Sequence, residues 1–145
     1  AWVGDSNNMC NTWLQAAEVL DFNVHVSTPP GYEVEPERAG LYGTDHFEQF
    51  ADPMDACRGA DLLIHDAEYR DEEYPKKRGW GHSTIEQAVS LALDAGVPRL
   101  GLFHHNQDRV DDEVDDLVAA CKRIIRERQS ALSCFAVHQG MDLAL

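Results

Sequence analysis

Four side chains able to ligate a metal lie at the ends of predicted strands or beside a predicted helix. Asp66 follows an apolar strand predicted over 61–65, and His82 precedes a predicted helix. His104 and His105 directly follow a second predicted strand. The C-terminal ends of parallel strands gather ligands at one edge of a sheet, and imidazole and carboxylate groups suit zinc or iron. Each group also has a plainer interpretation: a turn cap for Asp66, a helix cap for His82, and a hydrogen-bonded core pair for the last two.

A polar turn near the start of the chain is a second candidate site. It runs from Gly4 to Asn11, between a predicted strand and a predicted helix. Such a turn can aim small polar side chains and helix N–H groups at an anionic ligand. Asp5 or Ser6 could equally be a simple helix cap, which spacing alone favours.

Strand-like and helix-like segments alternate along the whole chain, which is typical of a layered α/β domain. Ser83 and Glu86 have the spacing of a helix-opening capping box. We predict a three-layer αβα sandwich with a mainly parallel, doubly wound sheet and an antiparallel pair of C-terminal strands around His138–Gly140. The strands are predicted at 2–4, 22–27, 46–50, 61–65, 99–103, 133–137 and 141–145, and the helices at 9–20, from 52, 83–95 and 111–128.

Composition restricts the class of protein. The 145 residues are enough for one domain, predicted to span 1–145. A net charge of -14 argues against binding nucleic acid or anionic lipid. No apolar run approaches the roughly 20 residues of a membrane helix, and no signal-like core opens the chain, so we predict a cytoplasmic protein. We expect its widely spaced cysteines to be reduced; they are Cys10, Cys57, Cys121 and Cys134.

The first 62 residues resemble the second, ornithine-binding domain of ornithine carbamoyltransferases. The resemblance rests on A-W-V-G-D-S-N-N-M at 1–9, S-T-P-P-G-Y-E at 27–33 and G-A-D-L at 59–62. It implies that Asn7 or Asn8 contacts the amino-acid substrate. The family's S-T-x-T-R, H-P-x-Q and H-C-L-P motifs are missing, so we expect carbamoyl transfer to be lost.

Residues 63–145 resemble the C-terminal half of a metallo-β-lactamase-fold hydrolase. The motifs are H-D-A-E-Y at 65–69, G-W-G-H-S-T at 79–84, F-H-H at 103–105 and G-M-x-L at 140–143. This resemblance makes Asp66 a metal-bridging carboxylate, His104 a metal ligand with His105 as the alternative, and His82 an accessory residue. The family's H-x-H-x-D-H cluster is absent, which excludes a two-metal site.

Together these patterns predict an engineered or recombined hybrid, joined near residue 62, that is no enzyme. The first alternative is single-zinc binding or weak metallohydrolase activity through Asp66, His82 and His104. The second is amino-acid binding at the Asn7–Asn8 turn. We expect no resident cofactor other than zinc, and a homodimer as the form that would cover exposed strand edges.

Overall fold

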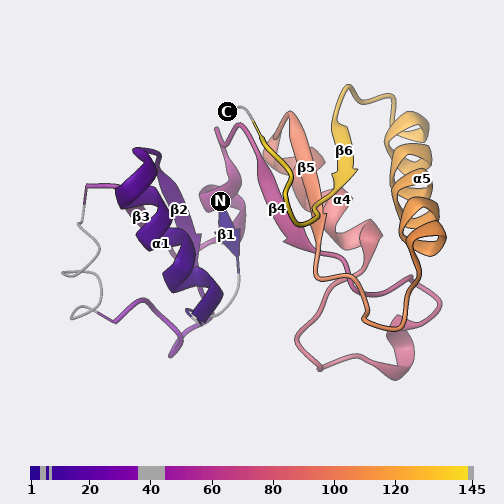
Figure 1. Ribbon diagram of the computed structural model, residues 1–145, viewed down its shortest axis with the longest axis horizontal. Helices are drawn as coiled ribbons and strands as arrows, with labels where there is room; N and C mark the ends of the chain where they lie inside the picture. The colour runs from indigo at the N-terminus through magenta and orange to yellow at the C-terminus, as the bar shows by residue number, and fades with distance from the viewer. Residues whose placement is uncertain (4–5, 7, 36–44, 144–145) are drawn as a thin grey trace. The chain divides into compact units, whose positions relative to one another are not determined.

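The computed structural model describes residues 1–3, 6, 8–35 and 45–143, and the chain divides into two compact units, Ala1–Ala60 and Asp61–Leu145. Each unit holds a three-stranded parallel sheet with its own helices (Figure 1). The predicted α/β class with mainly parallel strands is confirmed. The prediction of one domain across both units stays a prediction.

The N-terminal unit places one helix on each face of its sheet. Val24 and Val26 point into a core with Leu14 of α1, while the His25 ring between them meets the backbone carbonyl of Ala56 in α3 at 2.9 Å. Alternate strand residues face opposite sides, so α1 and α3 cover opposite faces. The elements are β1 (Trp2–Val3), α1 (Asn8–Leu20), β2 (Val24–Ser27), β3 (Phe47–Phe50) and α3 (Pro53–Cys57), and the sheet order is β1-β2-β3.

In the C-terminal unit the middle strand is β5, whose leucines Leu100 and Leu102 are buried. Leu100 pairs with the buried Cys134 of the neighbouring strand β6. Parallel neighbours need a crossover, which α4 supplies between β4 and β5 and α5 between β5 and β6. Gly101 leaves no room for a side chain, because a Cβ there would lie 2.7 Å from Val137 Cγ2. The elements are β4 (Leu63–Asp66), η1 (Tyr74–Lys76), α4 (Ile85–Ala95), β5 (Arg99–Phe103), α5 (Asp111–Glu127) and β6 (Ser133–Ala136).

The N-cap of α4 lies one residue later than predicted. Thr84 is the N-cap: its hydroxyl accepts the Gln87 N–H, and the Gln87 side chain accepts the Thr84 N–H. Ser83 cannot be the N-cap of a capping box, because its N–H donates to Asp66 and not to the Glu86 side chain. Its carbonyl accepts the Tyr69 N–H. The predicted Ser83–Glu86 box is therefore wrong, and tertiary contacts decide which of two adjacent hydroxyl residues caps the helix.

The C-terminal strand pair is only half present among the described residues. β6 is a strand that pairs parallel to β5, as its place after α5 requires. Met141–Leu143 has no strand conformation, and residues 144–145 lie outside the described residues. A tight turn at His138–Gly140 is thus not followed by strand pairing over 141–143.

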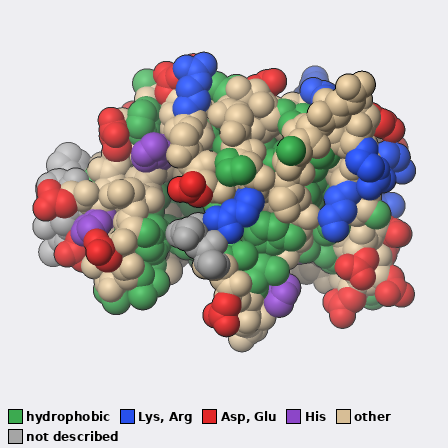
Figure 2. All heavy atoms as spheres, turned by 90° about the horizontal axis from the view of Figure 1, so that it is seen from above, with side chains coloured by type: hydrophobic (Ala, Val, Ile, Leu, Met, Phe, Trp, Pro, Cys, Tyr) green, Lys and Arg blue, Asp and Glu red, His purple; other side chains and the backbone are tan. Residues whose placement is uncertain are grey.

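Charges along α5 complement its backbone dipole. Asp111, Asp112 and Glu113 occupy the first turn and Arg126 the last. Figure 2 shows basic (blue) and acidic (red) side chains gathered in separate groups over α5. This distribution stabilises a helix, so its charge runs need no binding partner.

Apolar side chains at the end of α1 are open to solvent. Val19 is 80% and Leu20 69% exposed. The predicted homodimer would offer such side chains a partner, and it stays a prediction. No helix within the described ranges has the length and apolarity to cross a membrane.

The prediction that every cysteine is reduced is wrong for one pair. Cys121 in α5 and Cys134 in β6 form a disulfide, whereas Cys10 and Cys57 are free and buried. Burial raises the pKa of the Cys57 thiol, which keeps it protonated. The spacing of the cysteines in the sequence does not predict which of them pair, because it is the packing of α5 on β6 that brings Cys121 and Cys134 together.

Reduction of this disulfide should lower the stability of the C-terminal unit. The bond joins residues 13 apart, and closing a loop of about this length contributes about 3 kcal/mol through the unfolded state. We expect a phosphine reductant to lower the melting temperature of the full chain. A double Cys121→Ala, Cys134→Ala variant should have a lower melting temperature than the native protein, and the reductant should not change it. Equal melting of the native protein in both conditions would contradict this.

Candidate functional site

Two segments of the N-terminal unit meet at the C-terminal edge of its sheet. One follows β1 and the other follows β2, and these strands are parallel. Ser6 joins the two: its N–H donates to the Tyr32 carbonyl at 3.1 Å and its hydroxyl to the Glu33 carbonyl at 2.8 Å. The edge therefore brings together the two motifs that carry the carbamoyltransferase resemblance.

Asn8 is the first residue of α1 and is exposed, so its side-chain amide is accessible to solvent. Thr12 donates from its hydroxyl to the Asn8 carbonyl at 2.9 Å, which anchors that turn. Asn7, the other predicted ligand residue, lies outside the described residues. Hydrogen bonds from the Gly31 and Glu33 N–H groups lower the pKa of the Glu33 carboxyl, so a carboxylate stands beside this turn.

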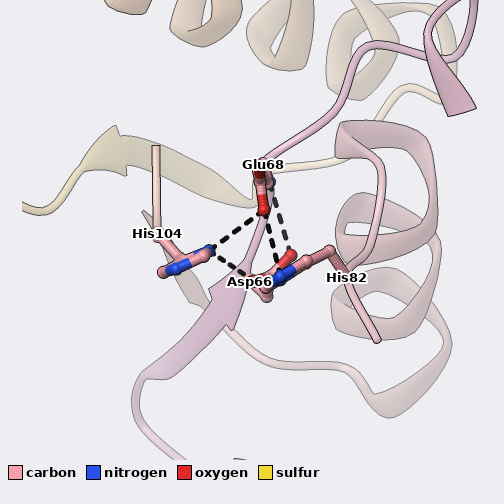
Figure 3. A group of neighbouring side chains, drawn as sticks. All are labelled: Asp66, Glu68, His82 and His104. Carbon is pink, nitrogen blue, oxygen red and sulfur yellow. Dashed lines mark hydrogen bonds and ion pairs between the residues drawn. The ribbon is translucent and has the colours of Figure 1, made fainter. Parts of the chain in front are cut away.

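A second group of side chains gathers at the C-terminal edge of the other sheet (Figure 3). Asp66 ends β4 and Glu68 follows it, His82 lies two residues before the N-cap of α4, and His104 follows β5. One ligand atom from each of the four lies within 4.8 Å of all the others. In Figure 3 the four side chains point toward one another from three separate stretches of chain.

Asp66 is the centre of this cluster. Its Oδ2 lies 2.8 Å from His82 Nδ1 and 3.2 Å from His104 Nδ1. Its Oδ1 accepts the Ser83 N–H at 2.7 Å and the Glu68 N–H at 3.4 Å. One oxygen thus holds the loop in place, as the turn-cap interpretation supposes, while the other faces the two imidazoles.

The two imidazoles stack face to face. The ring centroids of His82 and His104 are 4.5 Å apart with an angle of 11° between the rings. His104 has a φ of 58°, in the left-handed region that costs a residue with a Cβ some free energy. A strained backbone therefore holds one imidazole toward the carboxylates, which is a frequent feature of functional sites.

The structure separates His105 from this group. Both nitrogens of its ring are buried and make no hydrogen bond within the described residues. Burial lowers its pKa, and the charge of Arg109 lowers it further, so the ring is neutral. Of the predicted metal residues, Asp66, His82 and His104 come together and His105 does not.

Sequence reasoning missed Glu68, which contributes a second carboxylate to the cluster. The signal was present in the alternation of an extended chain, since residues two apart point to the same side. Asp66 and Glu68 have that spacing. Asn106 and Arg109 were also missed. Both follow β5 in the sequence, and both donate a hydrogen bond to Glu68.

Residues 1–92 match the family described as aspartate/ornithine carbamoyltransferase, Asp/Orn binding domain. The ornithine carbamoyltransferase of Aromatoleum aromaticum is 89% identical over 66 residues, which is 46% of this chain and 22% of the relative. That of Nitrosomonas europaea is 53% identical over 121 residues, which is 80% of this chain and 39% of the relative. The chain thus spans well under half the length of these relatives.

A solved mitochondrial ornithine carbamoyltransferase from Coccidioides immitis is similar to the chain with a TM-score of 0.49 and 21% identity. The match covers 86% of this chain and 45% of the Coccidioides chain.

These matches overturn the prediction of an engineered or recombined hybrid that is no enzyme. The family match continues through the supposed junction near residue 62 to residue 92, and the Nitrosomonas relative aligns with 80% of the chain. The matched relatives are named as enzymes. No comparison supports a metallo-β-lactamase-like half, whose motifs are short and leave most of residues 63–145 unconstrained. The chain belongs to the aspartate/ornithine carbamoyltransferase family, of which it matches the Asp/Orn binding domain over residues 1–92.

Proposed function

We propose that the N-terminal unit binds ornithine as part of a carbamoyltransferase. The observation that carries this proposal is the 89% identity of 66 residues to an ornithine carbamoyltransferase. The geometry supports it, because the two motif segments meet at the sheet edge where α/β proteins bind ligands. The exposed side-chain amide of Asn8 can donate to the ornithine carboxylate, and the Glu33 carboxylate supplies a negative charge for an ammonium group.

Ornithine binding by the full chain should depend on Asn8. Asn8→Ala removes a hydrogen bond to a charged group, worth about 1.5–3 kcal/mol, so affinity should fall about 10- to 100-fold. Titration calorimetry with ornithine measures this loss. Asn23→Ala, at an exposed asparagine outside both motifs, is the matched control and should bind as the native chain does. Equal affinity of all three proteins, or no heat of binding to any, would contradict the proposal.

We further propose that Asp66, His82 and His104 bind one zinc ion in the C-terminal unit. The observation that carries this second proposal is the convergence of their ligand atoms within 4.8 Å, together with one from Glu68. Neutral imidazoles and carboxylates are zinc ligands, and their convergence without a cation leaves two carboxylates facing each other. Zinc here would neutralise both.

Zinc content after equilibrium dialysis tests this site. The full chain, stripped with a chelator and dialysed against zinc, should retain about one ion per chain. His104→Ala should retain none, while His138→Ala, at an exposed histidine outside the cluster, should retain as much as the native protein. Equal zinc in the native and His104→Ala proteins would place the ion elsewhere and overturn the assignment.

A further inference from the structure

Glu68 holds an unsatisfied carboxylate oxygen inside the cluster. Its side chain is 13% exposed, and Oε2 is buried with no hydrogen-bond partner within the described residues. That oxygen lies 3.2 Å from His82 Nε2 and 3.3 Å from His104 Nδ1. A buried acceptor without a donor is costly, and a neighbouring carboxylate on Asp66 raises the cost. A cation bound between the imidazoles and the two carboxylates would compensate the charge of this oxygen.

The rest of Glu68 is held in position by groups outside the cluster. Asn106 donates from Nδ2 to Oε1 at 3.3 Å. Arg109 donates from Nη2 to the Glu68 backbone carbonyl at 3.0 Å. Asp66 shows the same arrangement, with Oδ1 bound by backbone N–H groups and Oδ2 facing inward. Such outer partners orient metal ligands.

We propose that Glu68 is the fourth ligand of a closed, structural zinc site. This inference rests on the proposed zinc site and adds its coordination. Zinc bonds of about 2.0–2.1 Å in a tetrahedron place ligand atoms about 3.3 Å apart. Three separations in the cluster match this value: His104 Nδ1 to Asp66 Oδ2 at 3.2 Å, His104 Nδ1 to Glu68 Oε2 at 3.3 Å and His82 Nε2 to Glu68 Oε2 at 3.2 Å. In this arrangement His82 is a ligand through Nε2, and its Nδ1 lies 2.8 Å from Asp66 Oδ2.

Four protein ligands leave no position for a water nucleophile, so the ion has a structural role. It connects the end of β4, the loop before α4 and the end of β5. The segment between Asp66 and His82 holds only the short helix η1 and an isolated bridge of Tyr69 to Thr84. Zinc should therefore stabilise this segment and raise the melting temperature of the protein.

Cobalt(II) absorption tests the coordination directly, because four-coordinate cobalt absorbs visible light far more strongly than six-coordinate cobalt. The native full chain should show strong bands at one equivalent. Glu68→Gln keeps an acceptor for Asn106 but lacks the charge, so its bands should weaken and its zinc affinity fall at least 10-fold. Glu72→Gln, at an exposed glutamate of the same segment, should match the native protein. Metal-free melting temperatures establish that all three fold.

Two results would overturn the inference in distinguishable ways. If Glu68→Gln gives native bands and affinity while His104→Ala loses metal, the zinc site stands with three ligands and Glu68 is not among them. If the native chain binds neither cobalt nor zinc, the zinc site itself is wrong.

Discussion

Asp66→Asn should lower zinc affinity at least about 100-fold, more than the loss of an outer-shell partner. The substitution removes the charge at the centre of the cluster, where Oδ2 lies nearest both imidazoles. Asparagine keeps an Oδ1 acceptor for the Ser83 N–H, so the loop before α4 retains its anchor. Loss of zinc binding with an unchanged metal-free melting temperature is the expected pattern, measured by competition with a zinc chelator and by thermal unfolding.

Asp66→Ala separates the two roles of this carboxylate. It removes the acceptor for Ser83 as well as the charge, so it should also lower metal-free stability by about 1–3 kcal/mol. Zinc binding by Asp66→Asn within a few-fold of the native affinity would refute the central position of Asp66. Equal metal-free stability of the asparagine and alanine variants would show that the Ser83 contact contributes nothing.

Glu73→Gln should destabilise the C-terminal unit by about 1–2 kcal/mol at pH 7, since the Glu73 side chain is 41% exposed and solvent screens part of the interaction. Arg109 is only 8% exposed on its side chain, and Glu73 is its ion-pair partner. Glutamine still offers an oxygen to the Arg70 N–H, so the change isolates the charge. A buried guanidinium that loses its carboxylate keeps only the Glu68 carbonyl among the partners described here. Denaturant unfolding measures the difference.

The cost of this substitution should depend on pH. Burial raises the pKa of Glu73, but hydrogen bonds from the Arg70 N–H and the Arg109 side chain, with their charges, outweigh it and lower the pKa below its usual value of 4.5. A carboxyl whose folded pKa is lowered stabilises the protein above its unfolded pKa, and this stabilisation is lost as the pH falls through the folded pKa. The difference between native and Glu73→Gln proteins should therefore be complete at pH 7 and shrink below about pH 4.5. Glu72→Gln should cost little at either pH, and a constant difference down to pH 3 would contradict this account.

Local patterns in the sequence predict the elements because each is determined by its own residues. Asp52 before Pro53 predicts the short helix α3, and the Asp52 side chain does accept the Met54 N–H. Gly96 predicts the end of α4 and has the left-handed φ of 71° that such an end requires. Alternation of strands and helices predicts parallel pairing, which both sheets show.

Long-range contacts decide what the sequence leaves open. The disulfide depends on how α5 packs on β6, which the sequence separation of 13 between its cysteines does not reveal. The N-cap of α4 is Thr84 because Asp66, 17 residues before Ser83, binds the Ser83 N–H. The Asp66–His82–His104 group follows from the rule that strand ends gather ligands, whereas Glu68 needed the loop to stay extended beyond β4.

Short motifs were misleading for the second half of the chain. H-D-A-E-Y and F-H-H describe a few residues at strand ends, and carboxylates and histidines occur there in unrelated proteins. The family match is continuous over residues 1–92, so it outweighs short motifs of this kind. The cluster keeps its chemical meaning without the hydrolase resemblance, since its ligand geometry comes from the structure alone.

The zinc K-edge absorption spectrum of the full chain with one equivalent of zinc tests the proposed cluster most directly. We predict four nitrogen or oxygen neighbours at about 2.0–2.1 Å, with the outer scattering of two imidazoles. A first shell of six neighbours, or scattering from no imidazole, would contradict a zinc site built from Asp66, Glu68, His82 and His104.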